Sequence, residues 1–270
     1  MPEGDTVTKL ALFLDQALAG QPIQSLRLHP AFGASAGPAC VEQVRARGKH
    51  LYIALDQGRV LRSHLGLYGS WHRYRANEPW RRPRRQASIL LRASDWDYVC
   101  FNAKEAEWLE QGSFRLADQQ QRLGKDLISE QIDASQILTR ARQLLSPTTL
   151  MVDVLLDQRI AAGIGNVYKS ELLFLKRHSP LATLGSLSDA ALAALYEQAA
   201  RLLRANLGGG PRRTRFERDR RGDLWVYGRR DLPCLHCAMP IRRAILGAQP
   251  RSTYWCERCQ GAAGRGSAAR

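Results

Sequence analysis

The sequence predicts an α+β protein of several domains, because the periodicity of its apolar residues changes along its 270 residues. Stretches with a period near two, typical of strands, fill the first hundred or so residues, and helical periods follow them. A run of strands followed by a run of helices indicates separate β-rich and α-rich regions rather than alternating β-α-β units. Four cysteines near the end of the chain add a third, compact module.

The β-rich region is assigned to residues 1–118 and begins with a helix. Apolar residues have helical spacing from Thr6 to Ala19, and Gly20 is placed to end that helix. The stretch Ala76–Gln86 is rich in proline and arginine and is predicted to be an exposed loop. Strand-like alternation occupies four segments: Val41–Leu55, Arg59–Leu65, Ser88–Arg92 and Tyr98–Asn102.

The helical region is assigned to residues 133–225. A polar stretch without strong periodicity, residues 119–132, precedes it and is predicted to be a hinge. The sequence Gly-Gly-Gly-Pro at 208–211 ends the helical part. Four segments have helical periodicity: Asp133–Leu145, Thr148–Ile160, Asn166–Lys176 and Ser188–Leu207.

The cysteine module, residues 226–260, carries the most specific metal signal. Two C-x2-C pairs lie eighteen residues apart, at Cys234, Cys237, Cys256 and Cys259. Four thiolates at this spacing can hold one tetrahedral Zn²⁺ ion with a β-hairpin between the pairs, and four protein ligands leave no open position, so the ion is predicted to be structural. His236 is expected at the surface rather than as a ligand. Residues 261–270 are small and polar and are predicted to be disordered.

Charge indicates the kind of partner. The chain has 40 basic and 25 acidic residues, a net charge of +15, and residues 201–270 hold sixteen arginines, no lysine and five acids. Arginine suits bidentate phosphate recognition, so this surplus favours a polyanion, above all nucleic acid. A solvated surface from an arginine-favouring, GC-rich genome is the alternative. No apolar run approaches the roughly 20 residues of a membrane span, and the first residues lack a signal peptide's basic region, so a cytoplasmic protein with no membrane partner is expected.

The N-terminal sequence Met-Pro-Glu-Gly can carry covalent chemistry. Removal of Met1 would leave Pro2 with a secondary amine, and terminal amines have a pKa near roughly 7.7–8.0, so a useful fraction is neutral at physiological pH. Such an amine can attack a sugar anomeric carbon and form an iminium ion. Glu3 could protonate the leaving group or the ring oxygen. Taken alone, Met-Pro-Glu is an ordinary chain start.

Four motifs in order give these residues a context. They are the opening Met-Pro-Glu-Gly, Arg47-Gly48-Lys49, Gly163-Ile164-Gly165-Asn166 and the terminal cysteines. Over residues 1–260 the chain thereby resembles the formamidopyrimidine-DNA glycosylase and endonuclease VIII family. The resemblance implies an N-terminal β-sandwich with flanking helices, a helix–two-turns–helix domain and a zinc-finger β-hairpin. It also implies a bifunctional base-excision-repair glycosylase and abasic-site lyase that acts on damaged duplex DNA as a monomer.

The resemblance assigns catalytic roles to four residues. Pro2 matches the Schiff-base nucleophile, and Glu3 matches the acid that assists base release and sugar opening. Lys49 matches the lysine that promotes β-elimination and contacts phosphate; by itself it would be a surface lysine at a strand end. Arg251 matches the arginine at the tip of the zinc-finger hairpin that is associated with phosphates and δ-elimination.

DNA contacts are implied at four further positions. Asn166 follows a Gly-x-Gly turn at a predicted helix start, where free amides favour phosphate, although asparagine is also a common helix cap. Arg122 matches a contact at the hinge. Leu67 and Tyr68 match the wedge that fills the gap left by a flipped base, and this pair resembles the endonuclease VIII branch, which favours oxidised pyrimidines.

Two positions depart from the family pattern. Gly66 stands where the enterobacterial wedge has a longer polar side chain, and Thr6 stands where a second glutamate is common. Pro211–Arg221 replaces the variable damage-recognition region and has no clear counterpart. The alternatives are an oxidised-purine glycosylase with the same chemistry, a zinc-dependent DNA-binding protein without catalysis, and a zinc-ribbon transcription or translation factor.

Overall fold

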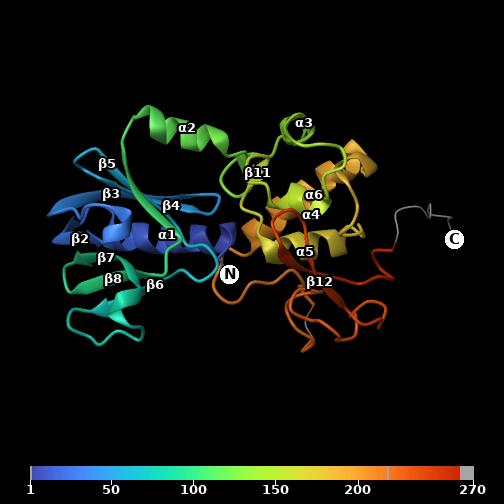
Figure 1. Ribbon diagram of the computed structural model, residues 1–270. Coiled ribbons are helices and arrows are strands. Elements are labelled where there is room, and N and C mark those ends of the chain that lie inside the picture. The colour runs from blue at the N-terminus through green and yellow to red at the C-terminus, as the bar shows by residue number, and fades with distance from the viewer. Residues whose placement is uncertain (1, 218, 262–270) are drawn as a thin grey trace. The chain divides into compact units, whose positions relative to one another are not determined.

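The computed structural model describes residues 2–217 and 219–261 (Figure 1). The chain divides into two compact units, unit 1 ending at Arg122 and unit 2 beginning at Leu123. Unit 1 is mostly β-structure and unit 2 is mostly helical, which confirms the predicted α+β fold class. The predicted disorder of 261–270 falls, except for Gly261, outside the described residues.

Unit 1 contains two antiparallel sheets. The first has the order β1-β3-β4-β5-β9 and the second has the order β2-β7-β8-β6. The first sheet consists of β1 Pro22–Ile23, β3 Ala39–Arg47, β4 His50–Leu55, β5 Arg59–His64 and β9 Glu105–Glu110. The second consists of β2 Ser25–Leu28, β6 Ser70–Arg75, β7 Ala87–Ala93 and β8 Trp96–Phe101. Two short 3-10 turns, Pro30–Phe32 and Arg84–Gln86, lie in the connections.

One apolar core joins the two sheets. Ile53 and Leu61 of the first sheet and Ile89 and Leu91 of the second belong to the same buried cluster, so the unit is a sandwich. Cys100 also lies in this core, and burial raises the pKa of its thiol far above the usual range. Because side chains of both sheets pack in this one core, the strands that lead into the loops at its ends are held in place.

Helix α1, Gly4–Leu18, covers the first sheet with its buried apolar face. It ends where Gly20 adopts a φ of 73°, a conformation that favours glycine, close to the predicted stop. The Gly20 amide donates to the Val41 carbonyl at 2.8 Å, and the Val44 amide donates to the Asp15 carboxylate at 2.7 Å. Residues near the start of α1 therefore lie beside residues near the end of β3, so the helix and the strand run antiparallel.

Unit 2 is built around a helical core. Its helices are α3 Ala134–Leu144, α4 Met151–Leu156, α5 Asn166–Leu175 and α6 Asp189–Ala205. Asp133 caps α3 by accepting from the amides of Ser135 and Gln136, and Ser188 caps α6 by accepting from the Ala191 amide. A parallel pair, β10 Lys125–Asp126 and β11 Ala161–Ala162, and a 3-10 turn, Leu184–Ser186, complete this part.

The cysteine module ends in the predicted hairpin. Strands β12, Arg242–Leu246, and β13, Arg251–Trp255, pair antiparallel between the two C-x2-C pairs. Among the described residues, no helix is both long and apolar enough to cross a membrane.

Several boundaries differ from the sequence expectation. The range 119–132, expected to be a hinge, includes the end of helix α2, Phe114–Arg122, and strand β10. Only Leu116 of α2 is buried, so this helix lacks the apolar stripe that reveals helices in a sequence. Helix α4 is much shorter than the segment 148–160, because only Met151–Leu156 is helical.

Candidate active site and metal centre

The N-terminus and Lys49 lie at the same end of unit 1. The Val44 amide bonds to Asp15, which fixes the register of α1 on β3. From Asp15 back to Glu3 a helix rises about 18 Å, and from Val44 to Lys49 a strand extends about 17 Å. Pro2 and Glu3 therefore reach the level of the turn that follows β3. Glu3 is fully buried at the N-cap position of α1, and Pro2 is half-buried.

Lys49 sits in a two-residue turn between β3 and β4. Arg47 and His50 face each other across the hairpin, so Gly48 and Lys49 alone make the turn. Gly48 has a φ of 57°, the left-handed region in which glycine carries no steric cost. This tight turn fixes the backbone of Lys49, whose half-buried side chain extends from the end of the sheet.

The loop between β5 and β6 emerges beside that turn. His64, the last residue of β5, pairs with His50, the first residue of β4, and their rings lie 4.9 Å apart. The loop that follows His64 therefore starts at the sheet end that carries Lys49. It is closed on itself, since the Gly69 amide donates to the Leu65 carbonyl at 3.0 Å.

Two apolar side chains project from this loop. Leu67 is 44% exposed and Tyr68 is 78% exposed, although the loop is anchored by the buried Leu65. These two neighbouring apolar side chains are exposed together at the tip of one loop. A leucine and a tyrosine held in this way are suited to replace a base in a stack.

Gly66, which precedes Leu67 and Tyr68 in the loop, lies where a side chain would not fit. Its φ is 63°, and a Cβ added there would lie 2.8 Å from the Cβ of Lys104. Lys104 is fixed in place because its amide donates to the His64 carbonyl at 2.9 Å and its ammonium lies 3.1 Å from Glu105. The space beside the two exposed residues is thus filled by Lys104.

A half-buried polar cluster supports this end of the sheet. Arg62 donates to Nδ1 of His50 at 2.7 Å and forms ion pairs with Glu105 at 3.0 Å and Glu107 at 2.6 Å. Burial, with His64 and Arg62 nearby, lowers the pKa of His50 to about 3. Burial also lowers the pKa of His64 to about 4. Both rings are therefore neutral at physiological pH and add no charge beside Lys49.

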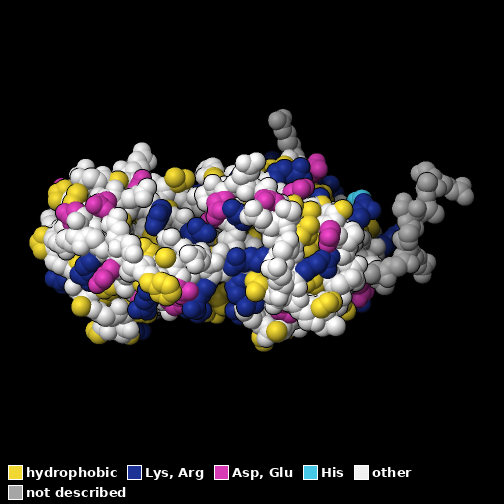
Figure 2. All heavy atoms as spheres, turned by 90° about the horizontal axis from the view of Figure 1, so that it is seen from above, with side chains coloured by type: hydrophobic (Ala, Val, Ile, Leu, Met, Phe, Trp, Pro, Cys, Tyr) yellow, Lys and Arg dark blue, Asp and Glu magenta, His cyan; other side chains and the backbone are white. Residues whose placement is uncertain are grey.

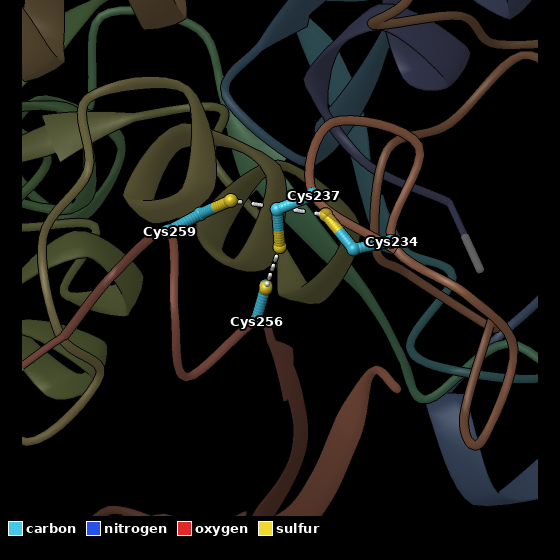
Figure 3. Close-up of side chains that lie close together, drawn as sticks. All are labelled: Cys234, Cys237, Cys256 and Cys259. Carbon is cyan, nitrogen blue, oxygen red and sulfur yellow. Dashed lines mark hydrogen bonds between the residues drawn. The ribbon is translucent and has the colours of Figure 1, made fainter. Parts of the chain in front are cut away.

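The four predicted cysteine ligands meet in unit 2 (Figure 3). All four Sγ atoms lie within 4.8 Å of one another; Cys234 and Cys259 are 3.8 Å apart, and Cys237 and Cys256 are 3.3 Å apart. Four sulfurs at 2.3 Å from a tetrahedral zinc ion would be about 3.8 Å apart. The separations lie around this value, so small shifts of the side chains would place all four sulfurs about one zinc ion. His236 is exposed and lies outside it.

Helix α5 carries polar side chains that are buried against the hairpin. Gly165 occupies the N-cap position, so Asn166 is the first helical residue and its side chain does not cap the helix. Instead, the Asn166 amide nitrogen donates to the Ser252 carbonyl at 2.8 Å. Lys169 is fully buried and donates to Oδ1 of Asn166 at 2.7 Å and to Oγ1 of Thr253 at 2.7 Å.

Glu171 ties the start of the cysteine module to the same helix. Its carboxylate accepts from the backbone amides of Trp225 and Val226, both at 2.8 Å, and of Tyr227 at 2.7 Å. The Thr214 hydroxyl donates to it as well. Burial raises the pKa of Glu171, while these bonds favour its charged form. One side chain thus holds three consecutive backbone amides.

The remaining two predicted residues occupy the ends of their elements. Arg251 is the first residue of β13, opposite Leu246, at the tip of the hairpin. Arg122 is the last residue of α2 and bonds to Asp118 at 2.9 Å, one turn back. Figure 2 shows many lysine and arginine side chains on the visible surface, with fewer acidic ones, as the composition requires.

Two family models match the chain. The formamidopyrimidine-DNA glycosylase N-terminal domain matches residues 1–120, and the formamidopyrimidine-DNA glycosylase H2TH domain matches residues 123–217. A "Probable endonuclease 8 2" of Streptomyces coelicolor is 37% identical over 96% of this chain and 94% of its own. The chain belongs to the formamidopyrimidine-DNA glycosylase family. Within it the chain is close to endonuclease VIII, as the wedge sequence indicated.

Other members agree with this assignment. A "DNA-(apurinic or apyrimidinic site) lyase Nei2" of Mycolicibacterium smegmatis is 33% identical over 96% of this chain and 99% of its own. The crystal structure of Lactococcus lactis formamidopyrimidine-DNA glycosylase, bound to DNA that contains an abasic site, matches with a TM-score of 0.81 at 20% identity. That match covers 97% of this chain and all of the other, and it shows a common fold.

The structure thus gathers the predicted residues into two groups. In unit 1 the N-terminus, Lys49 and the exposed Leu67 and Tyr68 share one end of the sandwich. In unit 2 the cysteines form one cluster, and Asn166 contacts the strand that begins at Arg251. The buried Lys169 was not found from the sequence, because a lysine on a helix is normally expected to face solvent.

Proposed function

We propose that the protein is a bifunctional DNA glycosylase and abasic-site lyase of base excision repair, acting on oxidised bases in duplex DNA. The observation that carries this proposal is the meeting of three features at one end of unit 1: the Pro2–Glu3 terminus, the Lys49 turn and the exposed pair Leu67–Tyr68. A nucleophile, a cation and a base-sized apolar filler are what excision of a flipped nucleotide requires.

Base removal is assigned to Pro2 and Glu3. The Pro2 nitrogen attacks C1′ of the flipped nucleotide, the glycosidic bond breaks, and its electron pair leaves with the base. Glu3 supplies a proton to the leaving group or to the ring oxygen, and opening of the sugar gives an iminium ion between Pro2 and C1′. Glu3 immediately follows the nucleophile, so both groups reach the same sugar.

Strand cleavage follows from the iminium ion. The positive nitrogen acidifies the C2′ proton; its removal, promoted by Lys49, expels the 3′ phosphate by β-elimination. Removal of a C4′ proton then expels the 5′ phosphate by δ-elimination, which we assign to Arg251. Water finally hydrolyses the imine and frees Pro2. The electrons of each broken C–O bond leave with the phosphate, so no redox step is needed.

Binding of the DNA backbone is assigned to unit 2 and to the end of α2. Asn166 stands in the first turn of α5, where backbone amides and the helix dipole favour a phosphate. Arg122 and Arg251 present guanidinium groups at the ends of their elements. We retain residues 1–118 as the catalytic domain, 119–132 as the hinge, 133–225 as the DNA-binding domain and 226–260 as the zinc finger.

One structural zinc ion is proposed for the cysteine cluster. The sulfur separations support it, and the fully buried Cys256 makes a catalytic, solvent-accessible metal unsuitable. When bound, the ion would hold the two C-x2-C turns together and thereby fix the hairpin. The substrate is chromosomal DNA, so we place the protein, as a monomer, at the nucleoid in the cytoplasm.

Oxidised pyrimidines are the proposed preferred lesions. The Leu67–Tyr68 pair and relatives named endonuclease 8 support this choice. An oxidised-purine preference with the same chemistry is the alternative, because the family also includes enzymes named for formamidopyrimidine. Parallel excision assays on thymine glycol, dihydrouracil and 8-oxoguanine decide between them.

Borohydride trapping tests the chemistry directly. Reduction of the imine should link the protein covalently to a duplex that contains an oxidised base or an abasic site. The matched control is the same protein with an additional residue retained before Pro2, which should trap little DNA because the secondary amine is lost. Equal trapping by both forms would exclude Pro2 as the nucleophile.

A further inference from the structure

A fully buried lysine without a part in the proposed chemistry lies between the two phosphate-binding candidates of unit 2. Lys169, on the second turn of α5, has no exposed surface. Its ammonium lies within hydrogen-bond distance of three acceptors: Oδ1 of Asn166 at 2.7 Å, Oγ1 of Thr253 at 2.7 Å and the Ser252 carbonyl at 3.3 Å. Burial of an ammonium is costly unless such bonds compensate it, and these bonds restrict its position.

We propose that Lys169 is a positioning residue: its buried ammonium orients the Asn166 amide and holds β13 beside Arg251, so that both side chains are presented to a DNA backbone. This inference rests on the proposed function, which assigns phosphate contacts to Asn166 and Arg251. Lys169 has no exposed surface, whereas Asn166 keeps 6% of its surface exposed and Arg251 is half-buried, so Lys169 acts through these two residues.

The orientation of the Asn166 amide follows from donor chemistry. An ammonium can only donate, so the atom of Asn166 that lies 2.7 Å from Lys169 must be the oxygen. The NH2 group then points the other way, where one hydrogen is donated to the Ser252 carbonyl at 2.8 Å. Its second hydrogen is a donor of the kind that a phosphate oxygen accepts. Without Lys169, the amide could turn over and present its oxygen, which repels phosphate.

The same ammonium reaches the hairpin directly after Arg251. Ser252 accepts from both Asn166 and Lys169, and Thr253 accepts from Lys169. These two residues continue the strand that starts with Arg251 at the hairpin tip. The backbone from which the Arg251 side chain extends is therefore tied to the first turn of α5.

A neighbouring contact provides a matched control. Ser170 is also fully buried and also joins α5 to β13, since its hydroxyl accepts from the Tyr254 amide at 3.4 Å. The hydroxyl donates to the Asn166 backbone carbonyl at 3.3 Å and makes no contact with the Asn166 amide group. Ser170→Ala therefore loosens the same packing without changing the amide orientation.

The test is a double-mutant cycle on binding. Full-length wild type, Lys169→Met, Asn166→Ala and the double variant are titrated with a duplex that contains a tetrahydrofuran abasic-site analogue. Each single substitution should weaken binding about tenfold, the loss expected for one hydrogen bond to a charged group. The double variant should bind more weakly than Asn166→Ala by clearly less than tenfold, because the part of the Lys169 effect that passes through Asn166 is already lost and only the part that passes through the Arg251 strand remains. Ser170→Ala should bind within about twofold of wild type, and Lys169→Arg should recover part of the lost affinity.

Wild-type binding by Lys169→Met, or an effect that multiplies with that of Asn166→Ala, would overturn the proposal. Zinc content and thermal unfolding are measured on every variant. If Lys169→Met loses its zinc or does not fold, Thr253→Val replaces it in the cycle. It removes one acceptor of the Lys169 ammonium and should also weaken DNA binding. Wild-type affinity of Asn166→Ala would also overturn the inference, whereas failure of wild-type borohydride trapping alone would refute the proposed chemistry and leave the cycle interpretable.

Discussion

The two units use polar side chains in opposite ways. In unit 1 the candidate reactive groups stand at a terminus, a turn and a loop tip, around an apolar sandwich core. In unit 2 the polar residues of α5 are buried, and their hydrogen bonds connect the helix to the cysteine module. Chemistry needs groups that a substrate can reach, whereas recognition of a stiff duplex needs fixed distances between its contacts.

This contrast implies different consequences of mutation. A substitution of an exposed or half-buried reactive group at the end of unit 1 should mainly change the rate of a chemical step. A substitution among the buried polar groups of unit 2 should change stability, zinc retention and DNA affinity together. Each of the following experiments either finds this difference between the two units or shows that it does not exist.

Zinc removal should have the largest effect. Chelation should abolish DNA binding and excision because four thiolates without a metal cannot hold the hairpin that carries Arg251. The measurements are zinc content, expected at one ion per chain, and binding of an abasic-site duplex before and after chelation. Cys256→Ser should reproduce the loss, while Cys40→Ser in unit 1 should keep both zinc and activity. Full activity in zinc-free protein would contradict the assignment.

Glu3→Gln should have the second largest effect. Loss of a general acid typically lowers a rate by roughly 10²–10⁴-fold. Excision of an oxidised base should fall by this amount, measured under single-turnover conditions, while cleavage of a preformed abasic site should be much less affected. The control is Glu42→Gln on the exposed face of β3. Equal losses on both substrates would show that Glu3 serves more than base release.

Glu171→Ala should mainly lower stability. It leaves three consecutive backbone amides, one buried and two part-buried, without their acceptor, so the free energy of unfolding of unit 2 should fall by about 3 kcal/mol. Denaturant titration and the rate of zinc loss measure this effect. Glu197→Ala, which removes an exposed carboxylate from α6, should change stability by less than about 0.5 kcal/mol. Similar results for the two variants would refute the role given to the buried carboxylate.

Between pH 7 and pH 6, acid should destabilise unit 1 through its histidine pair by the smallest of these effects. Burial lowers the pKa of His50 to about 3 and of His64 to about 4, from 6.5 in the unfolded chain. Below pH 6.5 the unfolded state binds more protons, so stability falls as the pH drops towards 4. The slope is at most about 1.4 kcal/mol per pH unit for each histidine. The difference between wild type and His50→Gln isolates this contribution, and parallel profiles would contradict it.

Much of the architecture could be predicted from local patterns. The spacing from Thr6 to Ala19 indicated α1, and the C-x2-C pairs indicated a hairpin between them. Strand β9 was missed because its buried residues, Ala106 and Leu109, break the alternation of period two. Helix α2 was missed for a related reason, since it buries only Leu116.

The polar contacts of the candidate sites were harder to predict. The sequence predicted Asn166 as a phosphate contact, with helix capping as the alternative, and neither indicated that its side chain bonds to a strand 86 residues away. Lys169 and Glu171 lie on a helix whose faces are nearly all buried, so amphipathic spacing could not separate inward from outward residues. Such contacts depend on which segments meet in three dimensions.

The glycine at position 66 limits how this surface could be redesigned. Because a methyl group there would collide with the stem of Lys104, a third base-stacking or strand-contacting side chain cannot be installed by one substitution. Because the colliding atom is the Cβ of Lys104, only glycine at 104 would remove the clash, and it would sacrifice the ion pair with Glu105. The φ of 63° at position 66 would still disfavour a side chain, so a residue other than glycine there requires a different backbone in this loop as well as a change at position 104.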